Sequence, residues 1–128
     1  MTFASRQDAG WKLGCHLREE GVNADLVLGL PRGGVVVAAA VARVLQRPLD
    51  ALVVRKIGHP RHREFAVGAL AEPDVVILDE ASLVRNPVAR AQLDVVIAEE
   101  TQRLRQYQTQ FHRAGTLELS GKTVLLVD

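Results

Sequence analysis

The 128-residue sequence has a single cysteine and few aromatic residues. Because Cys15 has no second cysteine to pair with, no intramolecular disulfide can form, which is typical of proteins of the reducing cytoplasm. Aromatic residues make up only 4% of the chain. Modules that bind single-stranded nucleic acid need several aromatic side chains on one face, so the composition argues against that class.

The sequence also lacks an excess of one charge and a long hydrophobic run. Sixteen basic and fifteen acidic residues leave a formal charge of +1, which gives no electrostatic basis for binding duplex nucleic acid or anionic membranes. The longest uncharged apolar run, residues 33–42, is far shorter than the roughly 20 residues of a membrane span. Residues 1–7 have no apolar signal-peptide core. We therefore expect a cytoplasmic protein with no nucleic-acid or membrane partner.

The sequence does have the composition of a folded globular domain, with 48% apolar and 24% charged residues. A chain of this length predicts one domain, residues 1–128, that buries about two-thirds of its unfolded surface.

Apolar segments alternate with amphipathic ones along the chain, which predicts an α/β fold. The predicted strands are 25–30, 50–54 and 123–127, with a hairpin of 65–71 and 74–78 around Glu72-Pro73. The predicted helices are 2–21, 35–45 and a long one from Asn86-Pro87 to about residue 113, ended by Gly115. Residues 55–63 are predicted to be a basic loop. Near-continuous apolar strands are typical of parallel sheets covered on both faces. We predict the parallel strand order 49–54, 25–30, 123–127.

Ligands of open parallel sheets bind beyond the carboxyl ends of the strands. The residues that follow the three predicted strands are Pro31–Gly34, Arg55-Lys56 and Asp128. Right-handed connections would bring all three to one edge of the sheet. Cationic groups, glycines and a carboxylate at one edge suit a ligand with phosphates at one end and hydroxyls at the other.

The segment Pro31–Gly34 has two interpretations. It opens a predicted helix, whose first N–H groups and partial positive charge attract anions. Gly33 and Gly34 would let the backbone approach phosphate oxygens, and Arg32 could add a bidentate contact. Alternatively, the segment is an ordinary strand-to-helix turn with a solvent-facing arginine.

The basic segment 55–63 also has two interpretations, a solvated loop or a polyanion site. A metal site at His59, His62 and Glu64 is disfavoured, because no fourth ligand is near and the flanking arginines repel cations. Residues 115–123 resemble a phosphate loop, but the spacing is one residue too long and the segment precedes a strand.

Several motifs together resemble the type I phosphoribosyltransferases, and they follow one another through the whole chain. These motifs are Leu28-Gly-Leu-Pro-Arg-Gly-Gly34, Pro48-Leu-Asp50, Val54-Arg-Lys-Ile-Gly58, Glu64-Phe-Ala-Val-Gly-Ala69 and Gly121-Lys-Thr-Val-Leu-Leu-Val-Asp128. The opening residues Phe3, Arg6 and Asp8-Ala-Gly10 are similar to one bacterial branch of the family.

The resemblance implies a Rossmann-like parallel-sheet transferase that binds phosphoribosyl pyrophosphate, passes its ribose to a nucleobase-like acceptor and releases pyrophosphate with the help of Mg²⁺. It implies a pyrophosphate loop of Arg32, Gly33 and Gly34, with Arg55 and Lys56 on the same diphosphate. Residues 57–78 would be a mobile hairpin over the site. Asp128 would be the first acidic residue of the phosphoribosyl-diphosphate motif and would accept hydrogen bonds from the ribose hydroxyls.

The sequence ends at Asp128, where the family motif continues with a second acid and a Gly/Thr-rich loop for the 5′-phosphate. We therefore expect an incomplete core, truncated at its C-terminus, that is inactive by itself. Two alternatives stay open, a non-catalytic module that senses phosphates or nucleotides, and a truncated domain that serves only assembly. The sequence leaves the acceptor and the oligomeric state open, a homo-oligomer included.

Overall fold

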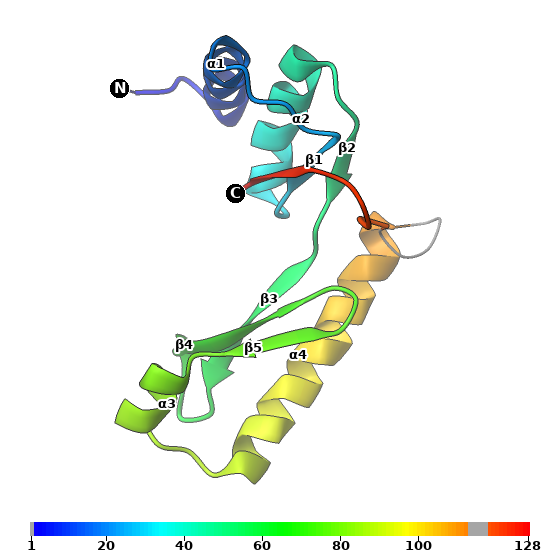
Figure 1. The fold of residues 1–128 in the computed structure, drawn as a ribbon. Coiled ribbons are helices and arrows are strands. Elements are labelled where there is room, and N and C mark those ends of the chain that lie inside the picture. The colour runs from blue at the N-terminus through cyan, green and yellow to red at the C-terminus, as the bar shows by residue number, and fades with distance from the viewer. Residues whose placement is uncertain (1, 113–117) are drawn as a thin grey trace. The chain divides into compact units, whose positions relative to one another are not determined.

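The structure, a computed structural model, describes residues 2–112 and 118–128. Its contacts divide the chain into two compact units, residues 2–52 with 118–128 and residues 53–112. Each unit has its own sheet and its own helices (Figure 1).

The first unit has a parallel sheet of β1 (Leu26–Gly29), β2 (Leu49–Ala51) and β6 (Val124–Val127) in the order β2-β1-β6. Gly29 lies opposite Ala51 on one side and Val127 on the other. This pairing confirms the predicted strand order. It also places the carboxyl ends of the three strands at one edge, so the residues that follow them begin side by side.

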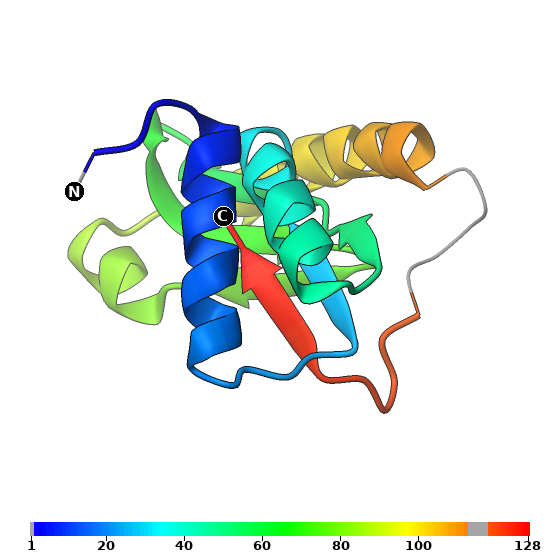
Figure 2. The same ribbon diagram turned by 90° about the horizontal axis from the view of Figure 1, so that it is seen from above.

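Two helices complete the first unit, α1 (Arg6–Glu19) and α2 (Gly33–Leu45). The hydroxyl oxygen of Ser5 accepts a hydrogen bond from the Asp8 amide at 3.0 Å, which caps α1. The two helices lie side by side (Figures 1 and 2). The core is formed by apolar residues of the sheet and of α2, namely Val27, Ala38, Val41, Ala42 and Val127.

The second unit has an antiparallel sheet of β3 (Val54–His59), β4 (His62–Ala71) and β5 (Val75–Leu78), followed by α3 (Glu80–Arg85) and α4 (Arg90–Phe111). The long helix α4 runs along this sheet (Figure 1). The core of this unit is formed by the buried apolar side chains of Val53, Ile57, Val67, Leu70, Leu93, Val96 and Leu104. The predicted hairpin of residues 65–71 and 74–78 is confirmed by the pairing of β4 with β5.

The predicted strand 50–54 and basic loop 55–63 are wrong. The parallel strand β2 ends at Ala51, and Val54 begins β3 of the other sheet. Residues 55–63 belong to the β3–β4 hairpin, in which His59 pairs with His62. Two basic side chains of this hairpin, Arg55 and Arg63, have acidic partners far along the chain, in α4. Because such partners are remote in sequence, the local charge run looked like a loop.

The predicted helix start at Asn86-Pro87 is also wrong. Asn86 instead ends α3, where its N–H donates to the Ser82 carbonyl at 2.9 Å. The α3 helix was missed, although the Asp79 carboxylate caps it by accepting from the Ser82 amide at 3.2 Å. Helix α4 begins at Arg90 and ends at Phe111. Residues 113 and 115, where the sequence predicted its end, lie outside the described residues.

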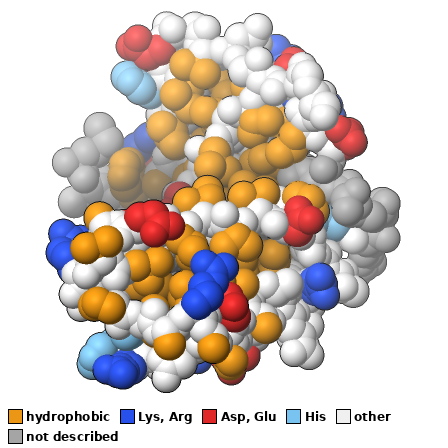
Figure 3. Space-filling model, turned by 60° about the horizontal axis from the view of Figure 1, so that its bottom comes forward, with side chains coloured by type: hydrophobic (Ala, Val, Ile, Leu, Met, Phe, Trp, Pro, Cys, Tyr) orange, Lys and Arg blue, Asp and Glu red, His pale blue; other side chains and the backbone are white. Residues whose placement is uncertain are grey.

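Hydrophobic side chains also reach the surface, and orange patches are visible in the space-filling view (Figure 3). In β5, Val75, Val76 and Ile77 are exposed by 44%, 46% and 64%.

Among the described residues, no helix combines the length and the apolar character that crossing a bilayer requires.

Candidate anion-binding site

The loop between β1 and α2 turns the chain sharply back onto the sheet. A Cβ atom placed on Gly29 would lie 2.7 Å from the Cα of Val35, closer than atoms can pack. A side chain at position 29 would therefore force α2 away from the strand. The peptide bond between Pro31 and Arg32 is cis.

The first amides of α2 are not capped by a side chain. Ser5 caps α1 and Asp79 caps α3, but Arg32 at the start of α2 makes no such bond. The Val35 amide donates to the Arg32 carbonyl at 3.2 Å. The amides of Gly33 and Gly34 therefore lie in the first turn, where helical N–H groups lack intrahelical acceptors and the helix carries partial positive charge. This end of α2 has the chemistry of an anion site.

Asp128 lies against the same loop. A Cβ atom placed on Gly34 would lie 3.0 Å from the carbonyl oxygen of Val127 and 3.1 Å from the Cα of Asp128. The Leu30 amide also donates to the Val127 carbonyl at 2.9 Å, which ties the end of β1 to the end of β6. The structure thus brings Arg32, Gly33 and Gly34 together with Asp128, as the strand order led us to expect.

Arg55 and Lys56 lie on β3, in the second unit, and do not directly follow a strand of the parallel sheet. The Arg55 Nε lies 2.9 Å from a carboxylate oxygen of Glu100. The Lys56 ammonium donates to the Glu64 carbonyl at 3.1 Å. The assignment of Arg55 and Lys56 to a diphosphate stays a prediction.

Glu100 pairs with three arginines of the second unit. Its side chain is buried, and its carboxylate contacts the guanidinium groups of Arg55, Arg103 and Arg63, the last at 3.5 Å. Burial is the largest single influence on the pKa of Glu100 and raises it, but hydrogen bonds and charges from Arg55 and Arg103 together lower it below its ordinary value. Glu100 is therefore an ionised partner that holds these arginines in place.

The imidazole of His59, in the β3–β4 hairpin, is held by the protein itself. The Nδ1 of His59 accepts from the Arg61 amide at 3.1 Å, and its Nε2 lies 3.2 Å from the Asn86 carbonyl oxygen. Both ring nitrogens of His59 are thus engaged. Over residues 2–112 and 118–128, the structure contains no group of three His, Cys, Asp or Glu side chains placed to hold a metal ion.

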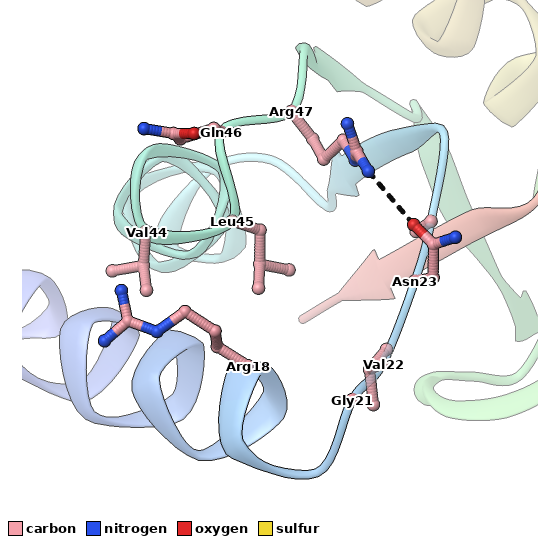
Figure 4. Close-up of a pocket in the computed structure, with 9 residues that line it drawn as sticks. Arg18, Gly21, Val22, Asn23, Val44, Leu45, Gln46 and Arg47 are labelled. Carbon is pink, nitrogen blue, oxygen red and sulfur yellow. Dashed lines mark hydrogen bonds between the residues drawn. The ribbon is translucent and has the colours of Figure 1, made fainter.

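A separate pocket lies at the opposite ends of α1 and α2 (Figure 4). Arg18 and Arg47 line it, and the Arg47 guanidinium donates to the Asn23 side chain at 3.0 Å. The sequence did not point to this pocket. Because helix C-termini carry partial negative charge, it is a poorer phosphate site than the first turn of α2.

The sequence also did not single out Arg6 as a site residue. A Cβ atom placed on Gly33 would lie 2.9 Å from the Nε of Arg6, so this guanidinium lies directly beside the loop. The two residues are the first of α1 and of α2. No local pattern could reveal this contact, because it depends on how the two helices pack.

The fold and the loop together define a phosphoribosyltransferase-like α/β core. The crystal structure of TT1426 from Thermus thermophilus has the same fold, with a TM-score of 0.83 and 39% sequence identity over the whole of this chain and 61% of that chain. The phosphoribosyl transferase domain family matches residues 12–128. The chain belongs to this family.

Two Mycobacterium tuberculosis proteins, from strains CDC 1551 and H37Rv, are each 39% identical to this chain over 127 residues. Both are named "putative phosphoribosyl transferase". The match covers 98% of this chain and 29% of each relative. The chain therefore spans less than a third of these relatives and about three-fifths of the TT1426 chain.

Proposed function

We propose that this chain carries the diphosphate-binding part of a phosphoribosyltransferase that uses phosphoribosyl pyrophosphate and releases pyrophosphate, with a nucleobase-like acceptor. The observation that carries the proposal is the first turn of α2, where the uncapped amides of Gly33 and Gly34 lie beside Arg32 and Asp128. Family membership supports the type of reaction, because the family matches the segment that contains this loop.

Each part of this site has a role in the proposed reaction. The bond between the ribose C1 and the diphosphate oxygen breaks, and its electron pair leaves with pyrophosphate. The amides of Gly33 and Gly34 and the Arg32 guanidinium would stabilise the negative charge that develops on the leaving group. The Asp128 carboxylate would accept hydrogen bonds from the ribose hydroxyls and orient the sugar. The acceptor nitrogen forms the new bond to C1, and its proton passes to solvent water.

Mg²⁺ belongs to this proposal as a companion of the donor. Mg²⁺ commonly binds through one or two carboxylates together with substrate phosphates and water. The site fits that pattern, because Asp128 is a carboxylate beside the loop. When bound with the donor, the ion would neutralise part of the diphosphate charge.

The proposal is tested by titrating the protein and its Arg32→Ala variant with inorganic pyrophosphate in a calorimeter. We expect the substitution to weaken binding by about 1.5–3 kcal/mol, the scale of a charge-assisted hydrogen bond, or roughly ten- to 150-fold. Arg18→Ala is the matched control, since it removes the same charge at the other end of the first unit. Unchanged affinity in Arg32→Ala would show that Arg32 is only a surface residue.

A further inference from the structure

The packing of α1 on α2 brings the beginnings of the two helices together. Gly10 lies against Val37, and Gly14 lies against Val44. A Cβ atom placed on Gly10 would overlap the Val37 carbonyl oxygen, and one placed on Gly14 would lie 2.9 Å from the Val44 Cβ. The contacts advance along both helices in the same direction, so the helices run parallel. The view from above shows them side by side (Figure 2).

This parallel packing positions Arg6 over the loop. Arg6 lies one helical turn before Gly10 on α1, and Gly33 lies one turn before Val37 on α2. The contact of Arg6 with Gly33 therefore continues the contact of Gly10 with Val37 toward the beginnings of both helices. The close packing of α1 on α2 therefore sets the distance between the Arg6 guanidinium and the first turn of α2. The position of Arg6 along α1 is fixed in turn by the Ser5 cap.

The charges around Arg6 leave its guanidinium available to a ligand. The nearest acidic residue of its own helix turn, Asp8, accepts from the Ala4 amide at 3.0 Å and pairs with the Lys12 ammonium at 3.0 Å. Within the part of the chain that the structure describes, no acidic side chain lies within ion-pair distance of Arg6. A guanidinium has five N–H donors and no acceptor, so an anion at the loop would be its natural partner.

We propose that Arg6 is a second guanidinium ligand of the diphosphate, an assignment that rests on the proposed function of the Pro31–Gly34 loop. Gly33 leaves room for this arrangement, since a Cβ atom at position 33 would lie 2.9 Å from the Arg6 Nε and the Arg6 side chain would have to shift. The diphosphate is then held between Arg6 from α1 and the amides and Arg32 of α2. Two cations suit a ligand with two phosphoryl groups better than one does.

The test is pyrophosphate titration of the Arg6→Gln and Arg6→Lys variants, with Gln7→Ala as the control on the same exposed turn of α1. Arg6→Gln keeps the aliphatic stem and removes the charge, and we expect it to raise Kd about five- to twentyfold. Arg6→Lys should recover only part of that loss, because an ammonium binds as a point charge. The difference between the protein and Arg6→Gln should shrink as the salt concentration rises.

The outcomes separate this inference from the proposed function. If Arg32→Ala weakens binding but Arg6→Gln behaves like Gln7→Ala, Arg6 is not a ligand and the loop still is. If the unmodified protein does not bind pyrophosphate, the proposed function fails and this inference fails with it. Thermal unfolding of each variant shows whether the fold is intact. If Arg6→Gln unfolds, the charge-conserving Arg6→Lys variant tests the inference instead. If Arg6→Lys bound pyrophosphate as tightly as the unmodified protein, a guanidinium-specific contact would be refuted.

Discussion

Replacing Gly10 by valine should lower the free energy of unfolding of the first unit by about 3 kcal/mol, the upper part of the range for overpacked cores. The cause is the Val37 carbonyl oxygen, which the new Cβ would overlap and which belongs to the backbone, so it cannot rotate away. Helix propensity alone would give the opposite sign, since valine is a better helix former than glycine. The measurement is urea unfolding followed by the fluorescence of Trp11, the single tryptophan of the chain, which lies on α1.

Gln7→Val is the matched control for this substitution, because it places the same side chain at an exposed position of the same helix. It should change the stability by less than about 0.5 kcal/mol. Gly10→Val should also weaken pyrophosphate binding, since α1 can no longer hold Arg6 beside Gly33. If Gly10→Val were as stable as Gln7→Val, the close contact of α1 with α2 would be refuted.

Replacing Glu100 by glutamine should destabilise the second unit by about 2–3 kcal/mol near neutral pH, because three guanidinium groups would lose their buried carboxylate partner. The arginines are partly exposed, which keeps the loss below that of a fully buried ion pair. Urea unfolding followed by circular dichroism measures this change, since α4 is the longest helix described. Glu99→Gln is the control, because Glu99 and Arg63 form an exposed pair and should contribute less than about 1 kcal/mol.

The Glu100 contribution should depend on pH in a defined direction. The pKa of Glu100 is lower in the folded protein than its ordinary value of 4.5. The carboxylate therefore stabilises the fold fully above that ordinary value, and the stabilisation is lost as the pH falls through the lower folded value. The difference in stability between the protein and Glu100→Gln should shrink in acid. A difference that stays constant or grows in acid would contradict the ion-pair network.

The sequence predicted the features that depend on local pattern. The short apolar runs 25–30 and 123–127 identify β1 and β6, and the Pro31–Gly34 segment marks the turn into α2. The strand order was predicted from three apolar strands separated by helical segments, the pattern of a parallel α/β sheet. The shared edge of Gly34 and Asp128 followed from that order, because neighbouring parallel strands end at the same side of the sheet.

The sequence did not predict the features that depend on distant partners. The apolar run through residues 50–54 gives no sign that the chain leaves one sheet after Ala51 and enters another at Val54. The β3–β4 hairpin is basic, and its Arg55 and Arg63 pair with Glu100 and Glu99, which lie far along the sequence. The sequence likewise gives no reason for Gly10 and Gly14, because the need for a small residue at these positions comes from the close packing of α2 against them.

The central claim, that the first turn of α2 binds the diphosphate, is tested most directly by backbone amide NMR during a titration with pyrophosphate. We predict that the amide signals of Gly33 and Gly34 shift most and saturate together, with smaller shifts at Arg32 and Asp128. Shifts confined to the basic segment of residues 55–63, or to the pocket of Arg18 and Arg47, would place the anion elsewhere and contradict this claim.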